Sequence, residues 1–157
     1  MSRDPQSPHL RHASRQRFGA PGRNRGAAVV ETAIDRVVGG CGLLSRRQDE
    51  FELGYCLRKS SWGRGIATEA VRAVLDAGFR HLHAHRVYAT VDPDNPSSAH
   101  VLEKLGFRRE GRARRDARIG EEWRDSLLYA LLAEEWNPNR PGAAKSPRSA
   151  ATAPRVR

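Results

Sequence analysis

The sequence predicts a single mixed α/β domain, with a central mixed sheet flanked by helices. Three observations support this prediction. The chain has 157 residues, enough for one ordinary domain. Hydrophobic residues make up 38% of it, or about 45% when the 14 glycines are added and the 3 tyrosines left out, as is usual for globular proteins. Short apolar runs broken by glycine give way, at about residue 65, to apolar residues with helical spacing.

The first three predicted elements are strands. Residues 27–30 and 36–44 are apolar runs rich in valine and leucine, separated by the polar pair Asp35-Arg36. This pattern is typical of a hairpin. A third strand is expected over 51–57, where apolar and polar residues alternate.

Helices and strands alternate in the next part of the chain. Apolar residues that recur every three or four positions predict an amphipathic helix over 65–80. Alternating apolar residues predict a strand over 87–91. Asn95 followed by proline fits an N-cap and a first helical position, and Gly106 fits the residue after a helix, so a short helix is expected over 96–105.

A closing hairpin completes the predicted domain. Residues 107–113 and 123–132 form its strands, joined by a polar loop that contains Gly120. The predicted order is therefore β-β-β-α-β-α-β-β, which is a mixed α/β arrangement.

The net charge of +10 is located at the two ends of the chain. Residues 1–26 hold six arginines and one acid, and residues 138–157 hold five basic residues and no acid. The segment 27–137 holds 17 basic and 17 acidic residues and is neutral. Because a nucleic-acid-binding domain needs positive charge on its folded surface, nucleic acid is not expected to bind this core. Both ends are predicted to be disordered tails around one domain.

Composition also bears on location. No apolar run reaches 18 residues, so no membrane span or membrane partner is expected. Only two cysteines, Cys41 and Cys56, are present, which favours a reducing, cytoplasmic setting. The arginine- and serine-rich start also loosely fits an organelle transit peptide.

The most informative segment is Trp-Gly-Arg-Gly-Ile-Ala-Thr-Glu-Ala at 62–70, between a predicted strand and a predicted helix. Glycines allow the backbone to curl so that N–H groups converge, and the helix N-terminus adds partial positive charge. Together they would bind a pyrophosphate. A tight turn that needs two glycines explains the same pattern, and both interpretations stay open here.

A second segment, Asn-Pro-Ser-Ser-Ala-His-Val-Leu-Glu-Lys-Leu-Gly-Phe at 95–107, follows after a helix and a strand. Together the two segments resemble the GNAT acetyltransferase superfamily, in particular the ribosomal-protein N-terminal acetyltransferases. Gly65 and Ala67 fill the last positions of that family's acetyl-CoA loop. Glu-Leu-Gly-Tyr at 52–55 and Trp-Arg-Asp-Ser-Leu-Leu-Tyr at 123–129 resemble its flanking strands. The resemblance covers residues 27–136.

The resemblance implies an acetyl-CoA-dependent N-acetyltransferase that moves an acetyl group directly to a primary amine. The acceptor would be a protein N-terminus or a small amine. Backbone groups of the strand 53–57 would contact the pantetheine arm and the acetyl carbonyl. The residues that the resemblance places at the cofactor are Tyr55, Cys56, Leu57, Trp62, Gly63, Arg64, Gly65, Ile66, Ala67, Thr68, Asn95 and Ser98.

Three features depart from the family pattern. Trp62 stands where the family's loop usually opens with arginine or glutamine. Leu102 occupies the position of a tyrosine that protonates the leaving thiolate in many relatives. Residues 1–26 do not resemble the family's usual first strand and two helices, so the chain is expected to lack them.

Two residues are predicted to be catalytic. Ser98 would hydrogen-bond or protonate the coenzyme A thiolate, or it would only bond within the first turn of its helix. Glu52, on the strand face opposite Leu53, would act as base for the amine, or it would be a solvated or ion-paired surface residue. Asn95 would cap its own helix, reach pantetheine, or do both.

Two further patterns are interpreted as structural. His81, His83 and His85 alternate, but no second group of ligands accompanies them, so no metal is expected. The arginine-rich run 108–115 is interpreted as a solvated hairpin edge, with an arginine reaching the 3′-phosphate of coenzyme A as the alternative.

Two rival functions remain at this point. One is a catalytically silent acetyl-CoA-binding module, favoured by Leu102 and the missing N-terminal elements. The other is a nucleic-acid-associated protein that acts through its basic tails. The resemblance also implies that the closing hairpin can support a homodimer.

Overall fold

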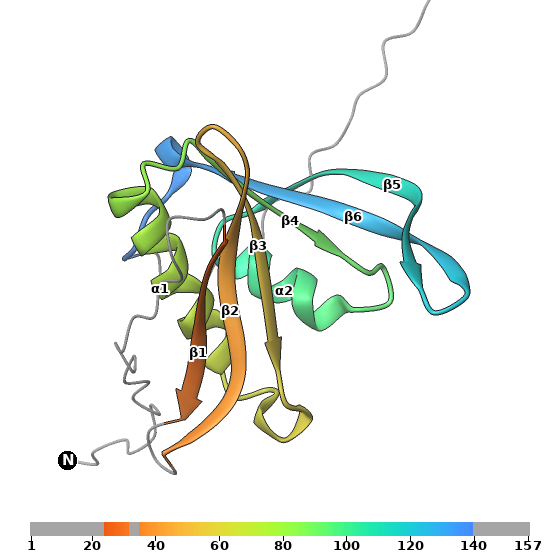
Figure 1. Cartoon of the computed structure of the whole chain (residues 1–157), viewed down its shortest axis with the longest axis horizontal. Coiled ribbons are helices and arrows are strands. Elements are labelled where there is room, and N and C mark those ends of the chain that lie inside the picture. Colours follow the sequence, from red (N-terminus) through yellow and green to blue (C-terminus); the bar gives the residue numbers. More distant parts are fainter. Residues whose placement is uncertain (1–23, 32–34, 140–157) are drawn as a thin grey trace, which may run out of the picture.

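The computed structural model describes residues 24–31 and 35–139. In this part of the chain six strands and two α-helices follow the predicted order (Figure 1). Short 3-10 turns lie at Lys59–Ser61 and Ala133–Glu135. The main elements are β1 (Asn24–Glu31), β2 (Arg36–Arg47), β3 (Glu50–Leu57), α1 (Ile66–His81), β4 (Arg86–Val91), α2 (Pro96–Lys104), β5 (Arg108–Ile119) and β6 (Glu122–Leu132).

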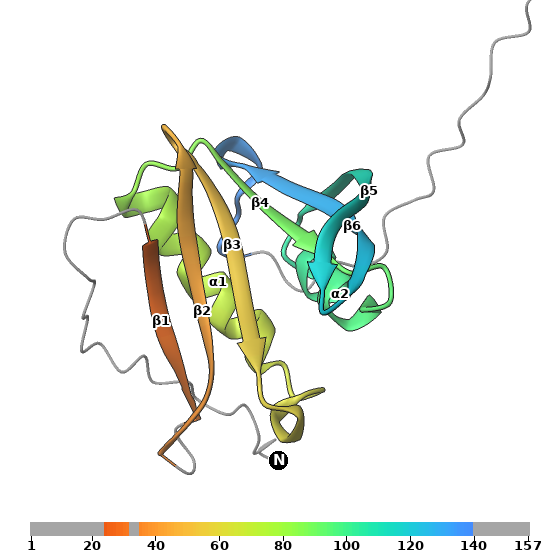
Figure 2. The same ribbon diagram turned by 45° about the vertical axis from the view of Figure 1, so that its right-hand side comes forward.

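The strands form one mixed sheet in the order β1-β2-β3-β4-β6-β5. β3 and β4 are parallel, and all other neighbours are antiparallel. The parallel ladder joins only Glu50–Glu52 to Arg86–Tyr88. Beyond these three pairs the two strands diverge, as Figure 2 shows. The predicted mixed α/β fold is confirmed.

Both helices lie on the same face of the sheet. Gly78 of α1 packs against Leu43 of β2, and the Tyr55 hydroxyl of β3 contacts Ser98 of α2. Leu43 pairs with Leu53, which shares its strand face with Tyr55. Within the described residues, the opposite face carries no helix, so the expectation of flanking helices is refined to one covered face. The fully buried side chains between helices and sheet are Val71, Leu75, Val87, Leu102 and Leu131.

The closing hairpin is longer than the sequence predicts. β5 continues to Ile119 instead of ending near residue 113, so the loop is reduced to Gly120 and Glu121. The ladder is irregular between Ala113 and Ala117, where the Asp125 carboxylate accepts the backbone N–H of Arg115 at 2.9 Å. Backbone pairing with β6 therefore extends a strand whose side chains are polar.

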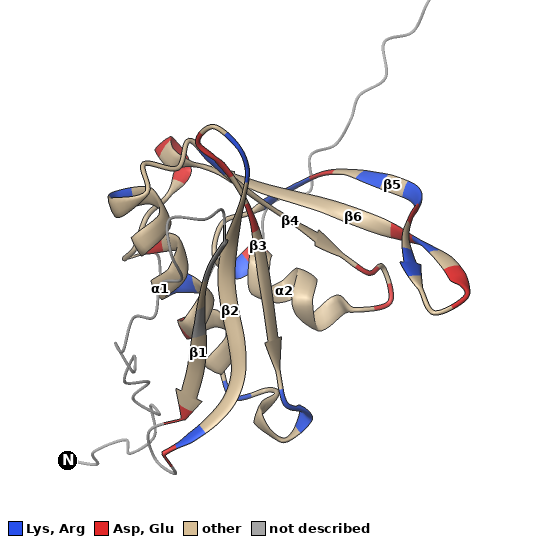
Figure 3. Cartoon of the chain, in the orientation of Figure 1, with Lys and Arg blue, Asp and Glu red and all other residues tan. Residues whose placement is uncertain are grey.

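The charged ends of the chain fall mostly outside the described residues. Most of the expected N-terminal tail (residues 1–23) and most of the expected C-terminal tail (residues 140–157) lie outside the described part of the chain. β1 already begins at Asn24, three residues before the predicted start of the domain at residue 27. Along β5 and β6, basic and acidic residues are interspersed (Figure 3). Neither α1 nor α2 has the length and apolar character that crossing a lipid bilayer requires.

Gly39 of β2 is expected to be sensitive to substitution. A Cβ at this position would overlap the backbone carbonyl of Cys56 on β3. We expect Gly39→Ala to lower the free energy of unfolding by about 2 kcal/mol. Gly54→Ala is the matched control, because nothing lies within 4 Å of its Cβ position. Denaturant unfolding of both variants checks this, and equal stabilities would contradict it.

Candidate functional site

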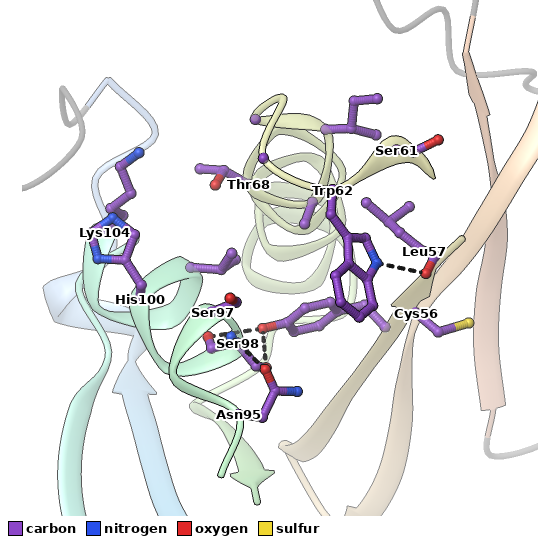
Figure 4. A pocket seen from close by; sticks show the side chains of 16 residues that line it. Cys56, Leu57, Ser61, Trp62, Thr68, Asn95, Ser97, Ser98, His100 and Lys104 are labelled. Atoms are coloured by element: carbon purple, nitrogen blue, oxygen red, sulfur yellow. Dashed lines mark hydrogen bonds between the residues drawn. The ribbon is translucent and has the colours of Figure 1, made fainter. Parts of the chain in front are cut away.

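A cavity of about 550 Å³ opens where β3 and β4 diverge (Figure 4). It lies between the end of β3, the start of α1 and one face of α2. Beyond Glu52, the backbone edge of β3 that faces β4 has no strand partner. Such an edge offers N–H and C=O groups to an extended ligand. The cavity is lined by Tyr55, Cys56, Leu57, Ser61, Trp62, Gly63, Gly65, Ile66, Ala67, Thr68, Asn95, Ser97, Ser98, His100, Val101 and Lys104.

The loop before α1 has a backbone geometry that would suit an anion. Gly63 and Gly65 have φ values of 70° and 76°, a left-handed conformation that glycine adopts without strain. Glu69 makes the first helical hydrogen bond, to Gly65 at 3.1 Å. The preceding N–H groups of α1 therefore have no intrahelical acceptor, and the helix dipole adds positive potential there. The two glycines thus lead the chain into α1 so that the residues of its first turn, Ile66, Ala67 and Thr68, line the cavity.

The two side chains of this loop that flank Gly63 have different positions. Trp62 lines the cavity, and its indole N–H donates to the Leu57 carbonyl at 2.9 Å. Arg64 does not line the cavity and pairs instead with Glu31 of β1, which is only 3% exposed. A buried carboxylate needs such a partner. The Arg64 side chain therefore anchors the loop to β1, and its predicted role at the cofactor stays a prediction.

The start of α2 brings a second group of polar atoms to the cavity. The Asn95 side chain accepts the Ser98 N–H at 3.1 Å and so caps the helix, as predicted. The Tyr55 hydroxyl lies 2.7 Å from Ser98 Oγ and 3.1 Å from the Ser98 carbonyl oxygen. Burial is the main cause that raises the pKa of Tyr55 above its ordinary value. The hydroxyl is therefore protonated at neutral pH.

The Tyr55 hydroxyl is a polar group at the cavity that sequence reasoning did not single out. The family resemblance implies that the backbone of Tyr55 contacts the cofactor, and its side chain is expected to lie in the core. Leu102, at the position of the family's usual tyrosine, is fully buried. Tyr55 instead supplies a phenol to the cavity from β3. The partners are 43 residues apart in the sequence, so no local signal indicates this contact.

One face of α2 adds further residues that the sequence did not single out. Ser97, His100, Val101 and Lys104 line the cavity at helical spacing. Figure 4 shows His100 and Lys104 together on the α2 side. The helical period starting at Ser97, which gives residues 100, 101 and 104, would have identified this face. No residue of the arginine-rich run 108–115 lines the cavity, and Arg112 pairs instead with Asp125.

Glu52 is not brought into the cavity. It lies on the β3 face opposite Leu53 and Tyr55. Its carboxylate accepts the Arg46 Nε–H at 2.6 Å. The two residues predicted to be catalytic, Glu52 and Ser98, are therefore not together. The ion-paired interpretation of Glu52 describes its contacts, and its role as base stays a prediction.

The cysteines and histidines show no further site in the described part of the chain. Cys56 is exposed beside the cavity, whereas Cys41 is buried, which raises the pKa of its thiol to about 12. The alternating histidines lie at the junction of α1 and β4. Across residues 24–31 and 35–139, no three potential ligands are grouped to hold a metal ion.

Comparison with known proteins agrees with this geometry. Residues 3–108 match the model of the acetyltransferase (GNAT) domain family. An uncharacterised N-acetyltransferase of Bacillus subtilis is 40% identical over 55% of this chain and 51% of its own length. The ribosomal protein uS5-alanine N-acetyltransferase of Escherichia coli is 38% identical over 56% of this chain and 45% of its own length. The chain thus spans about half the length of these relatives.

A solved structure shows the same fold. The GNAT-family acetyltransferase of Bacillus anthracis superposes with a TM-score of 0.66 at 33% identity, covering 71% of this chain and 68% of that one. The family model covers two thirds of the chain, including the loop at α1 and all of α2. These two elements also form the cavity. Because the family model matches two thirds of its length, the chain belongs to the GNAT acetyltransferase family.

Proposed function

We propose that this protein transfers the acetyl group of acetyl-CoA directly to a primary amine. One observation carries the proposal: a single cavity joins the glycine loop at the α1 N-terminus to the unpaired edge of β3. A ligand with a pyrophosphate and an extended amide-bearing arm matches both features. GNAT acetyltransferases use acetyl-CoA as co-substrate, which supports the same assignment.

The lining residues suggest how acetyl-CoA would lie. The N–H groups after Gly65, in the first turn of α1, would hold the pyrophosphate. Residues 55–57 of β3 would offer backbone groups to pantetheine. His100 and Lys104 bring a basic group to the α2 side of the cavity, where they would attract the remaining phosphate of the coenzyme.

The reaction would take place at the Tyr55 end of the cavity. A neutral amine would attack the thioester carbonyl, and a backbone N–H of β3 would stabilise the oxyanion that forms. The Ser98 hydroxyl would meet the leaving sulfur. Glu52 does not line the cavity. To act as base for the amine, it would have to do so from the opposite face of β3.

The kind of amine that we propose as acceptor depends on its pKa, because no carboxylate that could serve as base is among the residues that line the described cavity. An α-amino group, with a pKa of about 7.7–8.0, is partly neutral near pH 7.5, whereas lysine at about 10.4 is not. We therefore propose a protein N-terminus or a small amine as acceptor. The alanine N-acetyltransferase of Escherichia coli named above supports the first option.

A silent acetyl-CoA-binding module remains the second candidate, because the cavity lacks both a carboxylate and the family's usual tyrosine. Coenzyme binding without turnover on any amine would favour it.

Two further proposals concern location and assembly. The two free cysteines support a cytoplasmic setting. The closing hairpin would support a homodimer.

The decisive experiment is calorimetric titration of the full chain with acetyl-CoA, with desulfo-coenzyme A and NAD as comparators. We expect binding of both coenzyme A compounds and none of NAD. A panel of peptides and polyamines then tests turnover. Absence of acetyl-CoA binding would refute the proposal.

Two substitutions of Gly65 test whether an anion binds at the loop, because they differ in charge but not in shape. Gly65→Asp would place a carboxylate against the pyrophosphate, whereas Gly65→Asn adds a side chain of the same shape without charge. Both residues tolerate the left-handed conformation required there. We expect the aspartate variant to bind acetyl-CoA at least about tenfold more weakly than the asparagine variant, measured by calorimetry. Equal affinities would show that the loop is only a turn.

Ser98→Ala tests the hydroxyl at the leaving sulfur. The Asn95 cap is made by the Ser98 backbone N–H, so the helix start is retained. We expect kcat to fall on the order of 10²-fold with little change in the KM for acetyl-CoA. Steady-state rates with an acceptor from the amine panel measure this. An unchanged kcat would leave Ser98 with a structural role alone.

A further inference from the structure

A single tyrosine spans the gap between the diverging strands. Tyr55 extends from β3, past the point where the ladder with β4 ends, to Ser98 at the start of α2. Its ring packs against the hydrophobic core, and its hydroxyl lies in the cavity wall. The contact therefore sets the position of the Ser98 hydroxyl relative to the open edge of β3.

Hydrogen-bond counting gives two arrangements of the protons at the Tyr55–Ser98 contact. A tyrosine hydroxyl has one proton and faces two acceptors on Ser98, Oγ at 2.7 Å and the carbonyl oxygen at 3.1 Å. The carbonyl oxygen can only accept, whereas in the 2.7 Å contact either hydroxyl can donate. In one arrangement the phenol donates to the carbonyl oxygen and accepts from Oγ. In the other, which leaves the serine proton available to a ligand, the phenol donates to Oγ. Ser98 then keeps its own hydroxyl proton for another acceptor. Among the described residues, no other side chain bonds to Ser98 Oγ.

We propose that Tyr55 is a positioning residue for the leaving group: when coenzyme A is bound, the Tyr55 hydroxyl donates to Ser98 Oγ and so directs the Ser98 hydroxyl proton toward the coenzyme A sulfur. This inference rests on the proposed function. Two residues would then share the role of the tyrosine that Leu102 replaces. Ser98 would contact the sulfur, and Tyr55 would hold the Ser98 hydroxyl in position.

The arrangement adds no covalent step to the reaction. The amine nitrogen bonds to the carbonyl carbon, the C–S bond breaks with its electron pair on sulfur, and the nitrogen releases one proton to water. Tyr55 keeps its proton, because burial raises its pKa above the ordinary tyrosine value, whereas the thiol of a cysteine side chain has a lower pKa of about 8.5. The thiolate therefore receives a hydrogen bond and does not deprotonate the phenol.

The test measures the pKa of the bound coenzyme A thiol and needs no acceptor. Ultraviolet difference spectra of the full chain with coenzyme A, minus those with desulfo-coenzyme A, follow the thiolate across a pH series. A donor at the sulfur stabilises the thiolate and lowers this pKa. We expect Tyr55→Phe and Ser98→Ala each to raise it by about half a unit to one unit. The double variant should raise it no further than Ser98→Ala alone.

Tyr129→Phe is the matched control. The Tyr129 hydroxyl also reaches α2 from the sheet, donating to Glu103 Oε1 at 3.0 Å, but Tyr129 does not line the cavity. We expect this variant to keep the wild-type thiol pKa. Thermal unfolding of all variants shows whether each is folded, and Tyr55→Phe retains the ring that packs in the core.

The outcomes separate this inference from the proposed function. A thiol pKa in Tyr55→Phe equal to that of the wild type, with coenzyme A bound, overturns the role of Tyr55 alone. Equal shifts in Tyr55→Phe and Tyr129→Phe would indicate general loosening of α2 and also overturn it. Failure of the wild-type chain to bind coenzyme A overturns the proposed function, and the role of Tyr55 with it.

Discussion

β3 and β4 are joined at only three residue pairs, Glu50–Glu52 with Arg86–Tyr88, and then separate. Because each strand in a sheet needs a neighbour for its backbone groups, this separation leaves one edge of β3 unpaired in the middle of the molecule. The cavity occupies that gap. The acetyl-CoA site that we propose depends on this local loss of sheet pairing.

The gap is held open by contacts on either side of it. α1 packs on β2 and β3, whereas α2 is bonded to β6 through Tyr129 and Glu103. The Tyr55–Ser98 contact spans the two groups. The pair of Glu31 and Arg64 attaches the glycine loop to β1 at the other end. A cavity kept open by packing and by a few polar contacts needs little rearrangement to bind a ligand, which favours affinity.

The two helix starts at the cavity differ in what they leave available. At α2, the Asn95 side chain occupies one backbone donor, and proline at the first helical position has none. At α1, Gly65 provides no side-chain cap, so the donors of the first turn stay open. This contrast explains why the α1 end suits an anion, whereas the α2 end contributes hydroxyl groups instead.

The sequence by itself determined the order of the elements, the glycine loop before α1 and the Asn95 cap, because each depends on residues close together in the chain. Tertiary structure decided the rest. It lengthened β5 through pairing with β6 and placed both helices on one face. It also drew Arg64 to Glu31 and put Glu52 outside the cavity. The Tyr55–Ser98 contact joins residues 43 positions apart. Local sequence sets backbone conformation, but such contacts exist only once the strand order has brought distant segments together.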